Sequence, residues 1–184
     1  MTDEPQTLVR VGVTGHRRID DPRELTREVK AVLAALRRRY APPGDPDGSR
    51  VRLAAVSPIA EGADRLVVRA ALEEPGTTLT VALPFPADDY LQDFAEPASR
   101  REFAELLARA ETVEVLPPAA TRDESYERVG RWIVDHSDAI IALWDGLPSR
   151  GRGGTAEIVA YARERDVPVY WIRTNDGAPS TQEL

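Results

Sequence analysis

The chain has 184 residues and a formal net charge of −7, a length typical of one domain and a charge that argues against a broad nucleic-acid-binding surface. Hydrophobic residues make up 42% and charged residues 30%, which indicates a folded globular domain rather than a disordered chain. Cysteine is absent, which excludes disulfides, zinc–cysteine sites, iron–sulfur clusters and a thiol nucleophile.

Neither a membrane span nor a signal peptide is indicated, because no apolar run approaches the roughly 20 residues that a span requires. We therefore expect a cytoplasmic protein with no membrane partner and no nucleic-acid partner. Of the 24 basic residues, 23 are arginines and one is Lys30, so the Gly-Lys-Ser/Thr loop of nucleotide-binding proteins is absent. Arginine forks suit phosphate and carboxylate groups, which leaves a small anionic ligand open.

Six apolar runs of strand character alternate with helical patterns along the chain. The predicted strands cover residues 8–13, 51–56, 78–83, 112–116, 139–144 and 167–172. The predicted helices cover residues 22–40, 64–73, 99–110, 123–136 and 155–165. Near-continuous apolar strands predict a single-domain α/β fold, a Rossmann-like three-layer sandwich with a mainly parallel sheet of about six strands. We expect the domain to span residues 1–173 and a flexible tail to follow over 174–184.

Functional residues of such a sheet are expected beyond the carboxyl ends of the strands, where glycine loops lead into helices. The segment that ends the first strand is Gly-Val-Thr-Gly-His-Arg, residues 12–17. Glycines let backbone N–H groups approach a ligand, and Arg17 would contact a phosphate. A tight strand-to-helix turn without a ligand is the alternative interpretation. The candidate ligand-binding residues here are Gly12, Thr14, Gly15, His16 and Arg17.

The loop after the second strand leads into a helix N-terminus, where free N–H groups favour anions. It contains Glu-Gly-Ala-Asp at residues 61–64, and Ser57 stands at the end of the strand. Asp64 has two open interpretations, a ligand contact or a helix-start residue that complements the helix dipole. The candidate ligand-binding residues of this loop are Ser57, Glu61, Gly62, Ala63 and Asp64.

The strongest signal follows the fifth strand, where Trp-Asp-Gly at 144–146 precedes Gly-Arg-Gly-Gly-Thr-Ala-Glu at 151–157. Three glycines, a threonine and a helix start make a nest of backbone donors suited to phosphate. Glu157 would repel a phosphate and fits a capping box counted from Thr155 poorly, so we expect it to face a ribose or an anomeric carbon. A role that only complements the helix dipole stays open for it. The candidates are Asp145, Gly146, Arg152, Gly153, Gly154, Thr155 and Glu157.

Two further kinds of site are not indicated. The dinucleotide fingerprint needs three glycines spaced G-x-G-x-x-G and an acidic residue after the second strand, whereas residues 55–57 are Ala-Val-Ser. Neither His16 nor His136 has a second histidine or a cysteine at ligand spacing, so we predict no protein-built metal site. No cofactor is required, although Asp64 and Asp145 could hold a hydrated Mg²⁺ together with a phosphate.

These motifs together resemble the SLOG superfamily, a Rossmann-like nucleotide-binding group that includes the Smf/DprA proteins, the lonely-guy cytokinin-activating enzymes and the sensor domains of TRPM channels. The resemblance covers residues 12–172 and rests on the motifs Gly-Val-Thr-Gly-His-Arg, Glu-Gly-Ala-Asp, Trp-Asp-Gly and Gly-Gly-Thr. It implies a bacterial sensor of a nucleotide or an NAD-derived, ADP-ribose-like molecule in a signalling or conflict system. Signalling would need a separate effector protein, and we also expect a homo-oligomer, a dimer or larger.

The catalytic branch of the resemblance implies an alternative function. Lonely-guy enzymes hydrolyse the bond between base and ribose 5′-monophosphate with an arginine and the glutamate of P-G-G-x-G-T-x-x-E, whereas this chain has Ile158 at the glutamate position and lacks the proline. Nucleoside deoxyribosyltransferases are similar over residues 154–158 and use a glutamate nucleophile. The N-glycosidase alternative therefore assigns catalysis to Glu157 and Arg128. A scaffold that kept the fold without the ligand is a third possibility.

Overall fold

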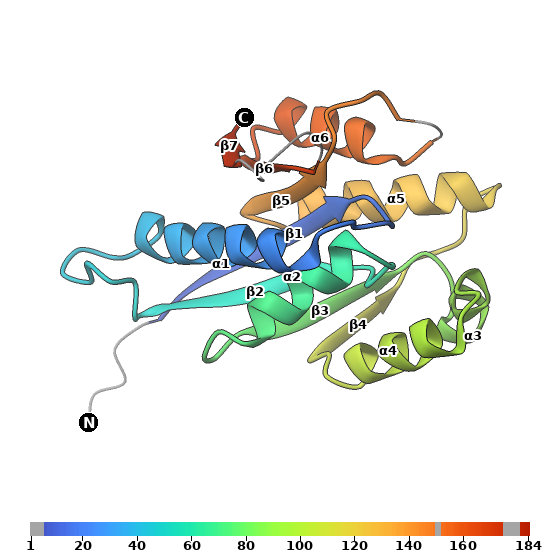
Figure 1. Cartoon of the computed structure of the whole chain (residues 1–184), viewed down its shortest axis with the longest axis horizontal. Helices are drawn as coiled ribbons and strands as arrows, with labels where there is room; N and C mark the ends of the chain where they lie inside the picture. Colours follow the sequence, from blue (N-terminus) through green and yellow to red (C-terminus); the bar gives the residue numbers. More distant parts are fainter. Residues whose placement is uncertain (1–5, 150–151, 175–180) are drawn as a thin grey trace.

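The computed structural model describes residues 6–149, 152–174 and 181–184, which form one sheet of seven strands with helices around it (Figure 1). The strand order is β4-β3-β2-β1-β5-β6-β7; β1 to β6 run parallel, and β7 runs antiparallel to β6. Within the described ranges, no helix is long and apolar enough to cross a membrane. The strands are β1 (Thr7–Gly15), β2 (Val51–Ser57), β3 (Thr78–Leu83), β4 (Thr112–Val115), β5 (Ala139–Trp144), β6 (Val169–Arg173) and β7 (Thr181–Glu183). The helices are α1 (Pro22–Arg39), α2 (Ala63–Leu72), α3 (Ala87–Tyr90), the 3-10 helix η1 (Leu91–Asp93), α4 (Pro97–Leu107), α5 (Arg122–Asp135) and α6 (Thr155–Glu164).

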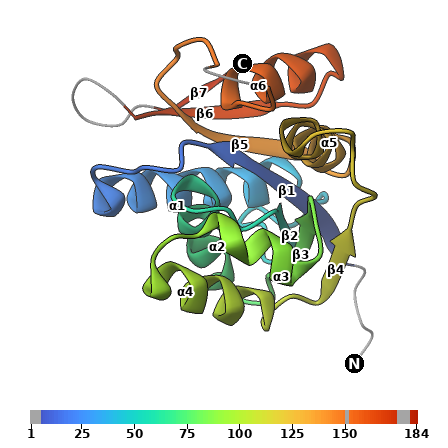
Figure 2. The same cartoon turned by 90° about the vertical axis from the view of Figure 1, so that its right-hand side faces the viewer.

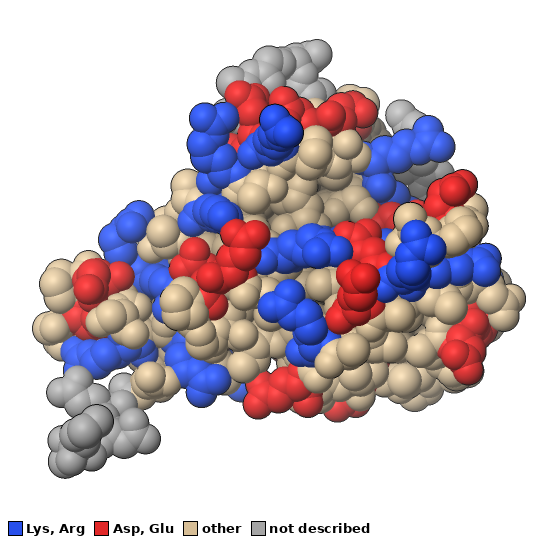
Figure 3. Space-filling view, turned by 60° about the horizontal axis from the view of Figure 1, so that its bottom comes forward, with Lys and Arg blue, Asp and Glu red and all other residues tan. Residues whose placement is uncertain are grey.

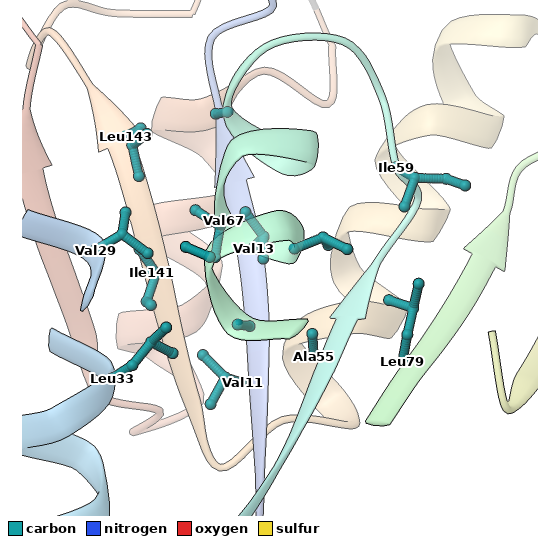
Figure 4. Packing of buried hydrophobic residues seen from close by; sticks show 14 of the residues in the cluster. Val11, Val13, Val29, Leu33, Ala55, Ile59, Val67, Leu79, Ile141 and Leu143 are labelled. Carbon is teal, nitrogen blue, oxygen red and sulfur yellow. The ribbon is translucent and has the colours of Figure 1, made fainter. Parts of the chain in front are cut away.

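Helices cover both faces of the sheet, which confirms the predicted Rossmann-like α/β sandwich (Figure 2). Helices α1, α2 and α4 pack on one face, and α5 and α6 pack on the other. Alternation along the strands supplies both cores: Val11 and Val13 of β1 lie among the α1 and α2 side chains (Figure 4), and Ile140 and Ala142 of β5 join the core under α5 and α6. Burial on both faces explains why the central strands are apolar throughout.

The strand order reverses at β1, which lies between β2 and β5. From β1 the chain builds the sheet outward through β2, β3 and β4, and then returns through α5 to place β5 on the other side of β1. The helices that follow β1 and β5, α1 and α6, therefore lie on opposite faces of the sheet. Open α/β sheets hold their ligands at such a switch point, beyond the carboxyl ends of the two strands.

Three short elements were not predicted: α3, η1 and β7. Helix α3 has 4 residues and η1 has 3, which is too short for helical periodicity to show in the sequence. Strand β7 is Thr-Gln-Glu, exposed throughout, and pairs with β6 through Thr181 and Ile172. This strand lies within the segment predicted as a flexible tail, 174–184, of which residues 175–180 lie outside the described ranges.

Gly12, a candidate ligand-binding residue, lies inside β1 and packs against α5. A Cβ there would lie 2.5 Å from Ile140 Cδ1 and from Ser137 Oγ, and 2.8 Å from Ile133 Cγ2. We predict that Gly12→Ala lowers the free energy of unfolding by about 1–3 kcal/mol through overpacking, measured by urea denaturation. In an Ile140→Val background, which lacks Cδ1, the cost should be smaller, because the two changes share one contact. An equal cost in both backgrounds would contradict this account of the packing.

Candidate functional site

A cavity of about 610 Å³ opens at the carboxyl edge of the sheet, above β1 and β5. Its walls come from the loops after β1, β2, β3 and β5, from α5 and from the start of α6. The structure thus brings together residues that the sequence analysis selected from three separate loops. The predicted ligand-binding residues that line the cavity are Thr14, Gly15, His16, Arg17, Asp64, Asp145, Arg152, Gly153, Gly154 and Thr155. The predicted residues that do not line it are Gly12, Ser57, Glu61, Gly62, Ala63, Gly146 and Glu157.

The end of β1 is packed so closely that a side chain does not fit on Gly15. A Cβ there would overlap the Ala63 side chain and lie 2.6 Å from the carbonyl oxygen of Leu143. The N–H of His16 donates to that carbonyl at 3.1 Å, and the N–H of Ala63 donates to the carbonyl of His16 at 2.9 Å. Gly62, with φ of +79°, turns the chain beneath the same carbonyl in a conformation that favours glycine. Gly62 and Ala63 therefore support the loop after β1 from behind.

His16 and Asp145 join the loops after β1 and β5. The His16 Nε2 lies 3.1 Å from the Asp145 Oδ1 and 3.1 Å from the Asp145 backbone nitrogen. The same Oδ1 accepts a hydrogen bond from the Leu147 N–H at 2.9 Å. Burial alone would raise the pKa of the Asp145 carboxyl, but the Leu147 N–H and the His16 ring outweigh burial and lower that pKa. Asp145 is therefore ionised at neutral pH, and its backbone N–H, which donates to the His16 Nε2, joins the two loops.

Arg17 and Arg18 supply positive charge to the cavity. Both line it, and both are exposed. Neither forms an ion pair with an acidic residue in the described part of the chain. The Arg17 guanidinium lies 5.6 Å from the centre of the Tyr126 ring, which also lines the cavity. Arg17 interacts with the Asp64 carboxyl only at longer range than an ion pair, so both guanidinium groups can still form hydrogen bonds to an anionic ligand.

Asp64 is a buried carboxyl in the cavity wall, only 5% exposed. Burial raises its pKa to about 7, although the Ala60 N–H, the Ser57 hydroxyl and the Arg17 guanidinium all favour the ionised form. The Ala60 N–H donates to Oδ2 at 3.2 Å. Near neutral pH the carboxyl therefore exists in both protonation states, and the protonated form can donate a hydrogen bond into the cavity.

Ser57 and Glu61 hold the loop after β2 in place. The Ser57 side chain is fully buried, and its Oγ accepts a hydrogen bond from the Ile59 N–H at 2.9 Å. Glu61 accepts a hydrogen bond from the Ser99 hydroxyl of α4, and Arg65, only 3% exposed, donates to the same hydroxyl at 2.8 Å. Both predicted ligand contacts are thus anchors of the loop instead.

Glu157 lies in the first turn of α6. The N-cap of this helix is Gly154, so Glu157 is its third residue, and its Oε2 accepts a hydrogen bond from the Gly153 N–H at 2.8 Å. The poor fit to a capping box holds in the structure, because the N-cap is a glycine without a side-chain cap and the Glu157 carboxylate binds the N–H of Gly153, the residue before the N-cap. The carboxylate is bound to the loop backbone rather than turned toward the cavity.

Arg128 lies outside the cavity. Its guanidinium donates to the carbonyl oxygens of Pro117 at 2.6 Å and Pro118 at 3.2 Å, in the segment before α5. Together with the position of Glu157, this means that the arginine and glutamate of the N-glycosidase alternative are not brought together at the cavity.

Two other predicted ligand-binding residues, Arg152 and Gly146, contact neighbouring side chains. Arg152 lines the cavity, but it forms ion pairs with Glu124 at 2.8 Å and Glu127 at 3.2 Å. Gly146, with φ of +83°, packs against Trp171; a Cβ there would lie 3.1 Å from that ring. Both are therefore better placed to shape the loop after β5 than to bind an anion.

Aromatic and apolar residues complete the lining, and sequence reasoning missed most of them. Tyr126 of α5 lines the cavity. Tyr90 belongs to helix α3, which was not predicted. Trp144 ends a predicted strand and directly precedes the candidate Asp145, and this position could have identified it as a lining residue. Within the described ranges, no group of three or more His, Cys, Asp or Glu side chains is arranged to hold a metal ion.

Comparison with known proteins shows a shared fold. No protein-family model matches the chain, and no curated protein sequence does. Among solved structures, the chain is similar to DNA processing protein A from Helicobacter pylori, described for its unique single-stranded DNA binding mode. The TM-score is 0.59 and the sequence identity is 17%. The match covers 95% of this chain and 69% of that chain. This likeness agrees with the part of the sequence resemblance that named the Smf/DprA proteins.

The expectation of no nucleic-acid partner is corrected by this comparison. A protein of the same fold binds single-stranded DNA, so a negative net charge is no basis for excluding that partner class. Basic and acidic side chains are interspersed over the face shown in Figure 3. The net charge of −7 is therefore a sum over basic and acidic side chains that lie close to one another on this face.

We predict that Asp64→Asn stabilises the protein increasingly as the pH rises from 4 to 7. Over this range the unfolded chain releases the Asp64 proton, whereas burial keeps it bound in the folded state until about pH 7, so the wild-type carboxyl costs stability as the pH rises. The difference should reach on the order of 4 kcal/mol. Urea denaturation of both proteins from pH 4 to 8 measures it, with Glu105→Gln, whose side chain is 69% exposed, as the control. A constant difference would show that Asp64 ionises normally.

Proposed function

We propose that this protein binds a nucleotide or an NAD-derived, ADP-ribose-like molecule in the cavity above β1 and β5. The observation that carries the proposal is the pair Arg17 and Arg18, which line the cavity without an acidic partner among the described residues. A guanidinium binds a phosphate through parallel charge-assisted hydrogen bonds. The two arginines stand at the switch point of the sheet, where this architecture accepts ligands.

Other features of the cavity support a phosphate-bearing ligand. Its volume of about 610 Å³ falls within the range of small-molecule sites, about 300–1,000 Å³. Helix α6 begins at the cavity with Thr155, and the first N–H groups of a helix have no partner within the helix. Gly154 lines the cavity and lets a ligand approach this backbone closely, whereas Gly153 packs against the Glu127 backbone of α5.

We infer binding or sensing, as in a SLOG sensor domain, rather than turnover. The N-glycosidase alternative needs Glu157 to attack or deprotonate and Arg128 to position a phosphate. Both side chains are engaged with backbone groups away from the cavity. What supports the sensing proposal is a cavity with free cations and no assembled pair of catalytic groups from that alternative.

Single-stranded DNA is a second candidate ligand, because the structural neighbour binds it. The same two arginines would meet its phosphates, so the two candidates differ in the length of the ligand and not in the location of the site. Binding of a longer strand would also weaken more steeply with salt than binding of a single nucleotide, because more counterions are released.

We predict that Arg17→Gln weakens binding of the preferred ligand about tenfold or more, because hydrogen bonds to charged groups contribute about 1.5–3 kcal/mol. Isothermal titration calorimetry with AMP, ADP-ribose and a short single-stranded oligodeoxynucleotide measures the affinity and identifies the ligand class. Arg38→Gln is the matched control, since Arg38 is exposed in the last turn of α1, at the opposite edge of the sheet.

The control should bind like the wild-type protein. Equal affinity of the Arg17→Gln and wild-type proteins, or a wild-type protein that binds none of the three compounds, would contradict the proposal.

A further inference from the structure

A pair of tryptophans stands at one end of the cavity. Trp144 ends β5 and lines the cavity, and Trp171 of β6 packs beside it with ring centres 5.3 Å apart and an angle of 41° between the rings. The Trp144 Nε1–H donates to the Leu147 carbonyl at 2.9 Å, and the Trp171 Nε1–H donates to the Trp144 carbonyl at 2.9 Å. Both indoles are therefore held in place, and Trp144 offers a ligand only the apolar surface of its ring.

Apolar surface is left open to water next to this ring. Leu147 lines the cavity and is 53% exposed, the largest exposure among the large hydrophobic side chains of the described residues. Trp144 itself is only half-buried. Exposed apolar area costs free energy in water, so a ligand that covers these two side chains gains affinity.

The cavity has a cationic part and an apolar part on different segments of the chain. The cations without an ion pair, Arg17 and Arg18, belong to the loop after β1, whereas the apolar side chains of Trp144 and Leu147 flank the ionised Asp145 at the end of β5. Apolar side chains of α5 and α6, among them Ile133, add to the apolar lining. A ligand that matches both parts carries a phosphate at one end and a flat, apolar ring at the other.

We infer that the Trp144 end of the cavity is a base subsite, in which the heterocyclic base of the nucleotide stacks on the Trp144 ring while its phosphate meets Arg17. This inference rests on the proposed function and adds the group that is recognised. A rigid indole suits this role because stacking on an aromatic ring contributes most when the ring is already fixed. It also accepts any base, since every base has a π-face.

Tryptophan fluorescence tests this subsite. The Trp132→Phe/Trp171→Phe protein retains only Trp144, and the Trp144→Phe/Trp171→Phe protein retains only Trp132, which stacks on His136 and does not line the cavity. Each is titrated with the four ribonucleoside 5′-monophosphates and with ribose 5-phosphate, which lacks a base. We expect the monophosphates to quench Trp144 and not Trp132, and ribose 5-phosphate to quench neither.

Calorimetry on two single variants completes the test. Trp144→Ala should weaken the best monophosphate about tenfold or more and leave ribose 5-phosphate unchanged. Leu147→Ser, at an exposed position where substitutions change stability little, should weaken the monophosphate in the same direction. If monophosphates bind but neither quench Trp144 nor lose affinity in these variants, the base subsite is wrong and the proposed function stands. If no phosphate compound binds, the proposed function fails together with it.

Discussion

The site depends on the missing side chain of Gly15. At this position β1 passes between the start of α2 and the end of β5 so closely that a Cβ would overlap Ala63 and approach the Leu143 carbonyl. The close approach lets the His16 N–H reach that carbonyl and lets the His16 carbonyl receive the Ala63 N–H. Three loops from distant parts of the chain are thereby held around one cavity at the switch point of the sheet.

The local charge at the cavity depends on which charged side chains form ion pairs or hydrogen bonds with neighbouring residues. Arg152 is neutralised by two glutamates, Glu157 is bound to the backbone of its own loop, and Asp145 holds His16. Arg17 and Arg18 remain without an acidic partner in the described part of the chain. A protein of net charge −7 can therefore present a local cationic site, because net charge sums over groups that are mostly compensated by near neighbours.

Periodicity and apolar runs predicted most of this fold. The predicted strands at 78–83 and 139–144 have the bounds of β3 and β5 in the structure, because both are buried, apolar and flanked by breakers. Strand β7 was not predicted, because its three polar residues show no hydrophobic alternation and the strand pairs with β6 through the backbone. The rule that ligands lie beyond the carboxyl ends of strands predicted which loops form the cavity.

Side-chain direction could not be predicted in the same way. The Glu157 carboxylate binds the Gly153 N–H, a contact that depends on the path of the loop before α6 and that residue spacing does not show. The Arg128 side chain could extend in several directions from α5. Its direction is set by hydrogen bonds to the carbonyl oxygens of Pro117 and Pro118, which the sequence does not reveal. The buried environment of Asp64 likewise depends on packing between elements that are far apart in the sequence.

The most direct test of the account is where a ligand contacts the protein. Backbone amide spectra recorded by ¹H–¹⁵N NMR during titration with AMP report this position for each glycine. The account predicts shifts at Gly15, Gly153 and Gly154 around the cavity, and none at Gly44 and Gly76, which lie at the opposite edge of the sheet. Shifts of equal size at both edges, or shifts that spare the three cavity glycines, would contradict it.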